Sequence, residues 1–200
     1  MAIKVANNQS LTAITALPSG VSGGAMTLLS TQTASSSSTI SFDSNIDSTY
    51  KEYQIHYTDV HPSANGEKFQ VNFRDGSTAY DATKTTTAFE SYNNEADNNS
   101  ALTYQSGNDL AQSTSAQHIS DGLGNENDES CVGILTIYAP ADTTFVKHFI
   151  IEANMYNGGD FSVHDFVAGY CNTTSAIDGV QFSMTSGNID AGTFKLYGIS

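Results

Sequence analysis

The chain has 200 residues, of which only 14% are charged, and seven basic against 21 acidic side chains give a net charge of −14 at pH 7. Nothing in so acidic a chain could form a basic groove for phosphates, so direct nucleic-acid binding is excluded. No apolar run reaches the roughly 18 residues that a membrane helix needs, so no membrane insertion is expected. The length suits one domain, and the many Ser, Thr and Asn residues favour strands and turns over helices.

Residues 1–24 differ in composition from the rest of the chain and end on the turn-rich SGVSGG. A short apolar rhythm runs through Ile3, Val5, Leu11, Ile14 and Leu17. Two interpretations stay open: a first strand with a linker, or an arm that docks on another subunit and becomes ordered only in the assembly. We prefer the N-terminal arm, assign its apolar residues to anchoring on a particle, and assign residues 25–200 to a β-sandwich domain.

From Ala25 onward, short segments of alternating or continuous apolar character recur between turn-forming residues. These predicted strands span 25–32, 38–43, 50–60, 67–75, 84–92, 130–140, 143–156, 165–172, 176–184 and 192–199, with a weaker one near Leu102 and Tyr104. No segment has the period of an amphipathic helix. About ten such strands predict an all-β fold, an antiparallel β-sandwich that is jelly-roll-like.

The alternation within each segment predicts which side chains face the core. These are Tyr53, Ile55 and Tyr57 in 50–60, Phe69, Val71 and Phe73 in 67–75, Phe145, Phe149 and Ile151 in 143–156, and Phe194 and Leu196 in 192–199. In the closing segment, Lys195 and Tyr197 take the other face. We therefore expect the chain to end inside the sheet of a complete β-domain.

One connection carries a strong turn signal. The HPSANG segment at 61–66 contains Pro62 and the Asn65-Gly66 pair, which favour tight reversals of the chain. It joins two alternating segments of similar length, 50–60 and 67–75. We therefore predict that these two segments form a β-hairpin.

No arrangement of reactive side chains points to catalysis, a cofactor or a metal. The five histidines and two cysteines lack a zinc-binding spacing, and the carboxylates of 121–129 lack the EF-hand pattern. We interpret that segment as a solvated acidic loop, with bound Ca²⁺ as the alternative. His164-Asp165 suggests a hydrolytic triad, but no nucleophile elbow accompanies it. Cys131 and Cys171 lie in apolar segments and are expected to be buried free thiols, with a disulfide as the alternative.

The polar region from 90 to 118 is the better candidate for a binding surface. It is rich in Tyr, Asn, Asp and Gln, and aromatic faces with amide groups are suited to stacking on sugars and hydrogen-bonding them. The candidate glycan contacts are Tyr92, Asn94, Tyr104 and Gln105. A solvated polar loop has the same composition, and that interpretation also stays open.

Two segments, IDSTYKEYQIHYTDVHP at 46–62 and TTSAIDGVQFSMTSGNIDAGTFKLYGIS at 173–200, resemble a β-sandwich module common in virion proteins of tailed bacteriophages, particularly marine ones. The KTTTAFESYNNEAD and TTFVKHFI segments fit the same module, so the resemblance covers most of residues 26–200. It implies a structural appendage, such as a head decoration or a tail fibre, and carries over no catalytic residues. The chain lacks the fibrous repeats of long tail fibres, which favours a compact knob.

We therefore expect a non-enzymatic structural protein of the virion, assembled in the host cytoplasm. Residues 1–24 would anchor it to other virion proteins of the head or tail, and the sandwich would face outward. Several copies are expected to associate, as a homotrimer. The alternative is a receptor-binding module that recognises a host surface glycan. A depolymerase or esterase is the third class, and would need a nucleophile pocket that the sequence does not reveal.

Overall fold

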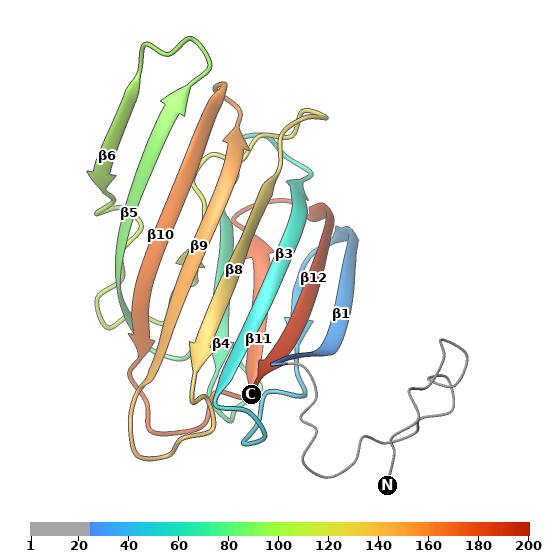
Figure 1. Ribbon diagram of the computed structural model, residues 1–200, viewed down its shortest axis with the longest axis vertical. Helices are drawn as coiled ribbons and strands as arrows, with labels where there is room; N and C mark the ends of the chain where they lie inside the picture. The colour runs from blue at the N-terminus through green and yellow to red at the C-terminus, as the bar shows by residue number, and fades with distance from the viewer. Residues whose placement is uncertain (1–24) are drawn as a thin grey trace, which may run out of the picture.

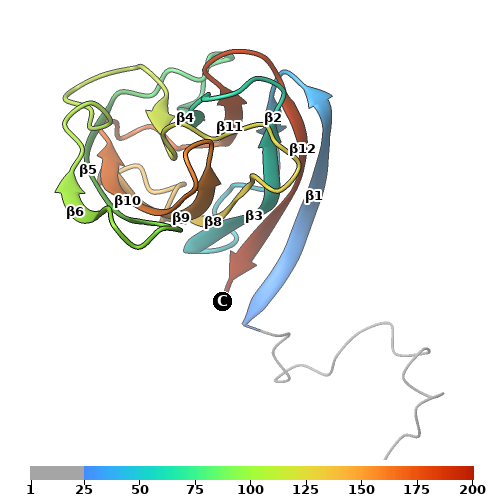
Figure 2. The same cartoon turned by 90° about the horizontal axis from the view of Figure 1, so that it is seen from above.

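Two antiparallel sheets packed face to face make up residues 25–200, the part of the chain that the computed structural model describes (Figure 1). These residues contain twelve strands and no helix, which confirms the all-β fold and the antiparallel sandwich. Figure 2 shows the larger sheet curving around the smaller one. The jelly-roll connectivity stays a prediction, and residues 1–24, with the anchoring residues Ile3, Val5, Leu11, Ile14 and Leu17, lie outside the described part.

The larger sheet has eight strands. In spatial order they are β1 (Met26–Ser37), β12 (Ile189–Ile199), β3 (Glu52–Pro62), β8 (Cys131–Tyr138), β9 (Lys147–Asn157), β10 (Phe161–Cys171), β5 (Lys84–Asn94) and β6 (Ser100–Tyr104). The smaller sheet has four, in the order β2 (Ile40–Phe42), β11 (Gly179–Met184), β4 (Phe69–Arg74) and β7 (Gln117–His118). None of residues 25–200 forms a helix that could cross a bilayer.

The core lies between the sheets and is centred on four aromatic rings. Tyr57 packs against Phe69 with ring centroids 5.3 Å apart, and Phe182 lies 5.5 Å from Phe69 and 5.3 Å from Phe194. Two of the rings come from the larger sheet and two from the smaller, and all four are fully buried. The predicted inward positions of β3, β4 and β12 are therefore confirmed.

The predicted hairpin between 50–60 and 67–75 is wrong, because the two strands belong to different sheets. β3 pairs with β12 and β8, whereas β4 pairs with β11 and β7. The connecting segment is held by other partners: the Ser63 amide donates to the Asn188 carbonyl at 2.9 Å, and the Gly66 amide to the Leu123 carbonyl at 3.0 Å. β3 and β4 each have one apolar side. Because the two strands lie in opposite sheets, these two sides pack against each other in the core, which removes both from water.

Phe145 was predicted to face the core, but its side chain is 71% exposed. Asp142 organises a turn there, since its carboxylate accepts the amides of Thr144 and Phe145 at 2.6 and 2.9 Å. β9 therefore starts only at Lys147, which takes the first inward position. The predictions for Phe149 and Ile151 are confirmed, since both are buried.

The closing strand enters the sheet as predicted. β12 lies between β1 and β3, with Phe194 and Leu196 buried and Lys195 exposed (Figure 1). The Ser200 amide donates to the Ala25 carbonyl at 3.0 Å, so the described part of the chain begins beside its last residue. Ala25 and Ser200 both lie at the β1 edge of the larger sheet, and β6 forms the opposite edge.

Candidate functional site

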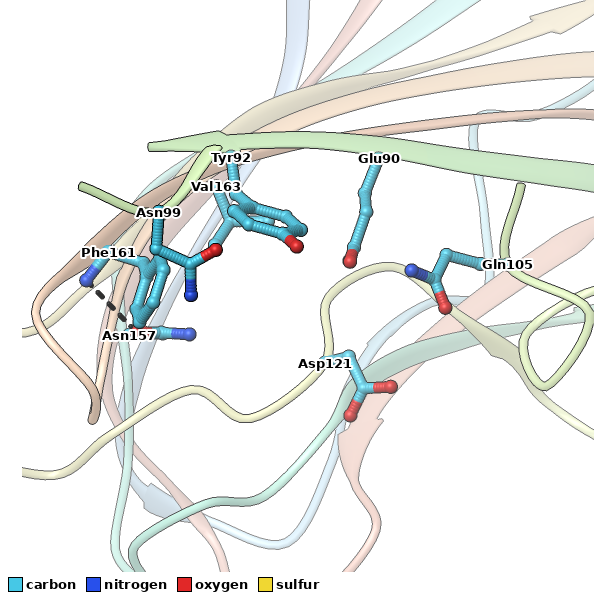
Figure 3. A pocket seen from close by; sticks show the side chains of 8 residues that line it. All are labelled: Glu90, Tyr92, Asn99, Gln105, Asp121, Asn157, Phe161 and Val163. Carbon is cyan, nitrogen blue, oxygen red and sulfur yellow. Dashed lines mark hydrogen bonds between the residues drawn. The ribbon is translucent and has the colours of Figure 1, made fainter. Parts of the chain in front are cut away.

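A pocket of about 280 Å³ opens near the β6 edge, on the inner face of the larger sheet. In Figure 1, β6 and the second half of β5 extend past the smaller sheet, so loops rather than strands cover their inner face there. The lining residues are Glu90, Tyr92, Asn99, Gln105, Asp121, Asn157, Phe161 and Val163. Figure 3 shows Tyr92 and Glu90 extending from β5 toward Asp121, with Gln105 at one end and the Asn99, Asn157 and Phe161 side chains at the other.

The carboxyl groups give the pocket its electrostatic character. Glu90 and Asp165 are cross-strand neighbours on the inner face of β5 and β10. Burial raises the pKa of Glu90, nearby Asp121 adds to the rise, and a hydrogen bond from Gln105 opposes it. The Asp165 side chain is 5% exposed, and its Oδ2 finds no hydrogen-bond partner among residues 25–200.

Asp165 is the most perturbed of these carboxyl groups. Burial raises its pKa to about 8, and the negative charges of Glu90 and Asp121 act in the same direction, whereas Lys68 acts in the opposite one. A carboxyl group desolvated in this way remains protonated at neutral pH. The inner face of β10 thus holds a neutral acid beside the acidic wall of the pocket.

A partly buried network holds the opposite wall in place. Lys68 Nζ donates to Asp121 Oδ2 at 2.9 Å and to Asn108 Oδ1 at 3.1 Å, and His118 Nδ1 lies 3.1 Å from the same Asn108 oxygen. Burial lowers the pKa of His118, and the charge of Lys68 lowers it further. The ion pair with Lys68 fixes the Asp121 carboxylate, since a charged partner at this distance restricts its rotation.

Two aromatic rings complete the pocket. Tyr92 and Phe161 meet edge to face with centroids 5.6 Å apart. Asn157 fixes the turn before β10, because its Oδ1 accepts the amides of Gly159 at 3.0 Å and of Phe161 at 3.2 Å (Figure 3). Ring faces, amides and carboxylates around one small cavity can stack on a sugar ring and accept hydrogen bonds from its hydroxyl groups.

The structure brings together two of the four glycan contacts predicted from the sequence, Tyr92 and Gln105. Asn94 instead organises the β5–β6 turn, where its Oδ1 accepts the amides of Asn98 and Asn99 at 3.1 and 3.0 Å. Tyr104 pairs with Phe89 across the strands, and its side chain lies on the side of the larger sheet that faces away from the pocket. Its hydroxyl donates to Asp109 at 2.6 Å.

Glu90 and Asn99 lie within the predicted 90–118 region without having been named as contacts, and sequence reasoning missed the other lining residues, since they come from separate loops and strands. Glu90 offered one usable signal, because it shares the inward alternation of Thr86 and Ala88 in β5. An acidic residue at such a position indicates a wet or functional interior. Asp121 was singled out only as part of the acidic 121–129 segment, and Phe161 offered no signal.

The remaining sequence candidates lie apart from the pocket or from one another. His164 is exposed while the next residue, Asp165, faces the core, because successive side chains on a strand point to opposite sides. The two therefore cannot act as a triad pair. Cys131 and Cys171 are buried and free, as expected.

The acidic loop at 121–129 is held by contacts within the chain. Asp121 pairs with Lys68, and the buried Glu129 carboxylate accepts the Glu126 amide at 2.6 Å. Across residues 25–200, no three His, Cys, Asp or Glu side chains gather closely enough to hold a metal ion.

No protein-family model matches the chain, and a search of curated proteins found no significantly similar sequence. The proposals about its function therefore rest on the fold, the geometry of the pocket and the chemistry of the surface.

Proposed function

We propose that this protein is a non-enzymatic structural component of a tailed-bacteriophage virion, an appendage of the head-decoration or tail-fibre type. The two segments that resemble such proteins, 46–62 and 173–200, contain three core strands, β3, β11 and β12. They supply three of the four rings at the centre of the core. The resemblance therefore involves the residues on which the sandwich depends, which supports the proposal.

The observation that carries the proposal is the placement of the two sheet edges. Residue 25 begins the described part of the chain at the β1 edge, and the pocket lies near the β6 edge at the far side of eight strands (Figure 1). An attachment made through residues 1–24 would hold the first edge against the particle. The pocket would then face away from the particle, as a displayed appendage requires.

Anchoring can be tested by changing all five apolar residues of the arm to Ser, at Ile3, Val5, Leu11, Ile14 and Leu17. We expect this variant to fold with an unchanged thermal melt but to be missing from purified particles, because apolar contacts supply most of the free energy of such docking. The control replaces the polar Asn7, Asn8 and Gln9 with Ala and should be incorporated normally. Normal incorporation of the five-residue variant would refute the anchoring role.

The second candidate function is recognition of a host surface glycan, and the pocket favours it. Its carboxylates and amides come from β5, β9 and three loops and converge on one cavity. Because Glu90 and Asp121 are acceptors when ionised, they suit the hydroxyl or amino groups of a sugar. This role is compatible with the first, since a displayed appendage is well placed to contact the host.

Glycan binding can be tested with the full-length protein on an array of bacterial surface saccharides. Tyr92→Ala and Gln105→Ala should each weaken binding about tenfold, as expected for the loss of one ring contact or one buried hydrogen bond. Gln112→Ala is the matched control, because Gln112 is exposed and bonds to Thr85 and Asn172 away from the pocket. Equal binding by all three variants would contradict a role for this pocket.

A further inference from the structure

Exposed apolar side chains gather on one surface of the domain. Among residues 25–200, eight large apolar side chains are exposed, and five of them belong to β5, β6 and β8. These are Phe89, Leu102, Tyr104, Val132 and Tyr138. In β5 and β8 the exposed residues are on the side of the strand opposite the buried ones. In β6, Leu102 and Tyr104 pair with the outward positions 91 and 89 of β5. All five side chains therefore point away from the smaller sheet. We call this side of β5, β6, β8, β9 and β10 the outer face.

Several apolar side chains of the outer face are neighbours across strands. Strand register aligns Tyr104, Phe89 and Phe166 in one row across three strands, and the last two rings stack with centroids 5.0 Å apart. A shallow groove runs beside this row, lined by Tyr138, His148, Ile150, Ala168 and Tyr170 among others. Soluble proteins rarely leave such a surface exposed unless it binds something.

The distribution of charged side chains indicates which kind of partner the outer face fits. The outward positions of the five strands carry a single charged side chain, Glu152, although the chain has 21 acidic residues and a net charge of −14. A basic partner would be attracted to the acidic surfaces elsewhere. Two copies of this chain repel each other least where carboxylates are few, and the outer face is such a surface.

The size of the outer face also suits a stable interface. Its three longest strands, β5, β9 and β10, have 11 residues each and therefore reach about 36 Å. Five neighbouring strands span about 20 Å at the usual spacing. The resulting area of about 700 Å² is close to the roughly 800 Å² that each partner contributes to an interface of standard size.

We infer that two copies of the chain associate face to face through the outer face. A surface that pairs with itself closes at two copies related by a two-fold axis. The stoichiometry is then a dimer rather than the homotrimer expected from the sequence. This association is independent of the pocket, which opens on the inner face of the same strands.

The inference is tested by measuring the mass of the full-length protein in solution between about 1 and 100 µM, the range of weak to moderate dimers. We expect twice the chain mass of 21.2 kDa. Leu102→Asp should weaken dimerisation tenfold or more, because an unpaired carboxylate would be buried in an apolar contact. Phe145→Asp is the matched control, since Phe145 is 71% exposed, against 72% for Leu102, and lies outside the outer face.

Val132→Asp provides a second disruption on a different strand, and both substitutions fall on exposed side chains that the fold does not need. A dimer that Leu102→Asp and Val132→Asp dissociate and Phe145→Asp leaves intact supports the inference. A monomer at every concentration, a trimeric mass, or a dimer that neither outer-face substitution weakens would overturn it.

Discussion

Replacing Asp165 with Asn should leave stability nearly unchanged at pH 4 and raise it by roughly 2–5 kcal/mol at pH 9. The side chain is 95% removed from solvent, and its Oδ2 has no partner among the described residues, so its ionised form is costly in the folded state. Burial raises its pKa to about 8, from an ordinary value of 3.8. The folded protein therefore holds a proton that the unfolded chain has released over most of this range.

The direction of the pH dependence follows from this difference in bound protons. Below pH 3.8 both states carry the proton, and Asp165 costs nothing relative to Asn. As the pH rises toward 8, folding requires the uptake of a proton, so the stability of the natural protein falls. Above pH 8 the carboxylate is ionised in its buried site and the full cost applies.

Urea denaturation of the natural protein and of Asp165→Asn at pH 4, 6, 8 and 9 gives the free energy of unfolding of each protein at each pH. The effect of Asp165 is the difference between these two free energies as a function of pH. Groups that titrate elsewhere affect both proteins alike and cancel in the difference. Asp128→Asn is the control, since it makes the same substitution at an exposed position of the 121–129 loop. Parallel pH profiles for the natural protein and Asp165→Asn would show that Asp165 ionises normally.

Gly133→Ala should destabilise the protein by about 3 kcal/mol, which corresponds to a melting temperature roughly 10 °C lower. Gly133 lies on the inner face of β8, where a Cβ atom would overlap the Glu152 carbonyl and the Tyr57 hydroxyl. The carbonyl belongs to the neighbouring strand β9 and cannot move without disturbing the sheet. The fully buried Tyr57 ring would have to shift instead, and its hydroxyl would lose the hydrogen bond to Glu152.

Thermal and urea unfolding of Gly133→Ala measure this cost directly. The matched control is Gly107→Ala, because a Cβ atom at Gly107 meets no atom within 4 Å and the backbone there needs no left-handed conformation. Its stability should stay within about 0.5 kcal/mol of the natural protein. Equal effects of the two substitutions would show that the space above Gly133 is not required for packing.

Two lysines show how much an alternating pattern leaves open. The inward face of β5 begins with Lys84, which is fully buried. Its ammonium group donates to the Asn72 side-chain oxygen at 2.5 Å and the Ala82 carbonyl at 2.8 Å, and burial lowers its pKa to about 8. Lys147 is buried in the same way against the carbonyls of Phe145 and Thr173. Neither set of oxygen partners could be inferred from neighbouring residues in the chain.

The pattern of apolar residues was sufficient to identify the strands other than the two-residue β7, and it identified the side chains of β3, β4 and β12 that enter the core. A period of two residues specifies the face of a strand locally, because alternate side chains point to opposite sides. It contains no information about which strand lies alongside, so the local turn signal at 61–66 suggested a hairpin where the structure has a crossing between sheets.

Strand pairing depends on burying every apolar face of the domain at once, which involves residues far apart in the chain. For the same reason, the pocket combines Glu90, Asp121 and Phe161, which are far apart in the chain. They are neighbours only in the folded domain, where the larger sheet extends beyond the smaller one. The outer face likewise exists only because five strands lie side by side. Local chemistry thus determines the elements of this protein, and their long-range packing determines its surfaces.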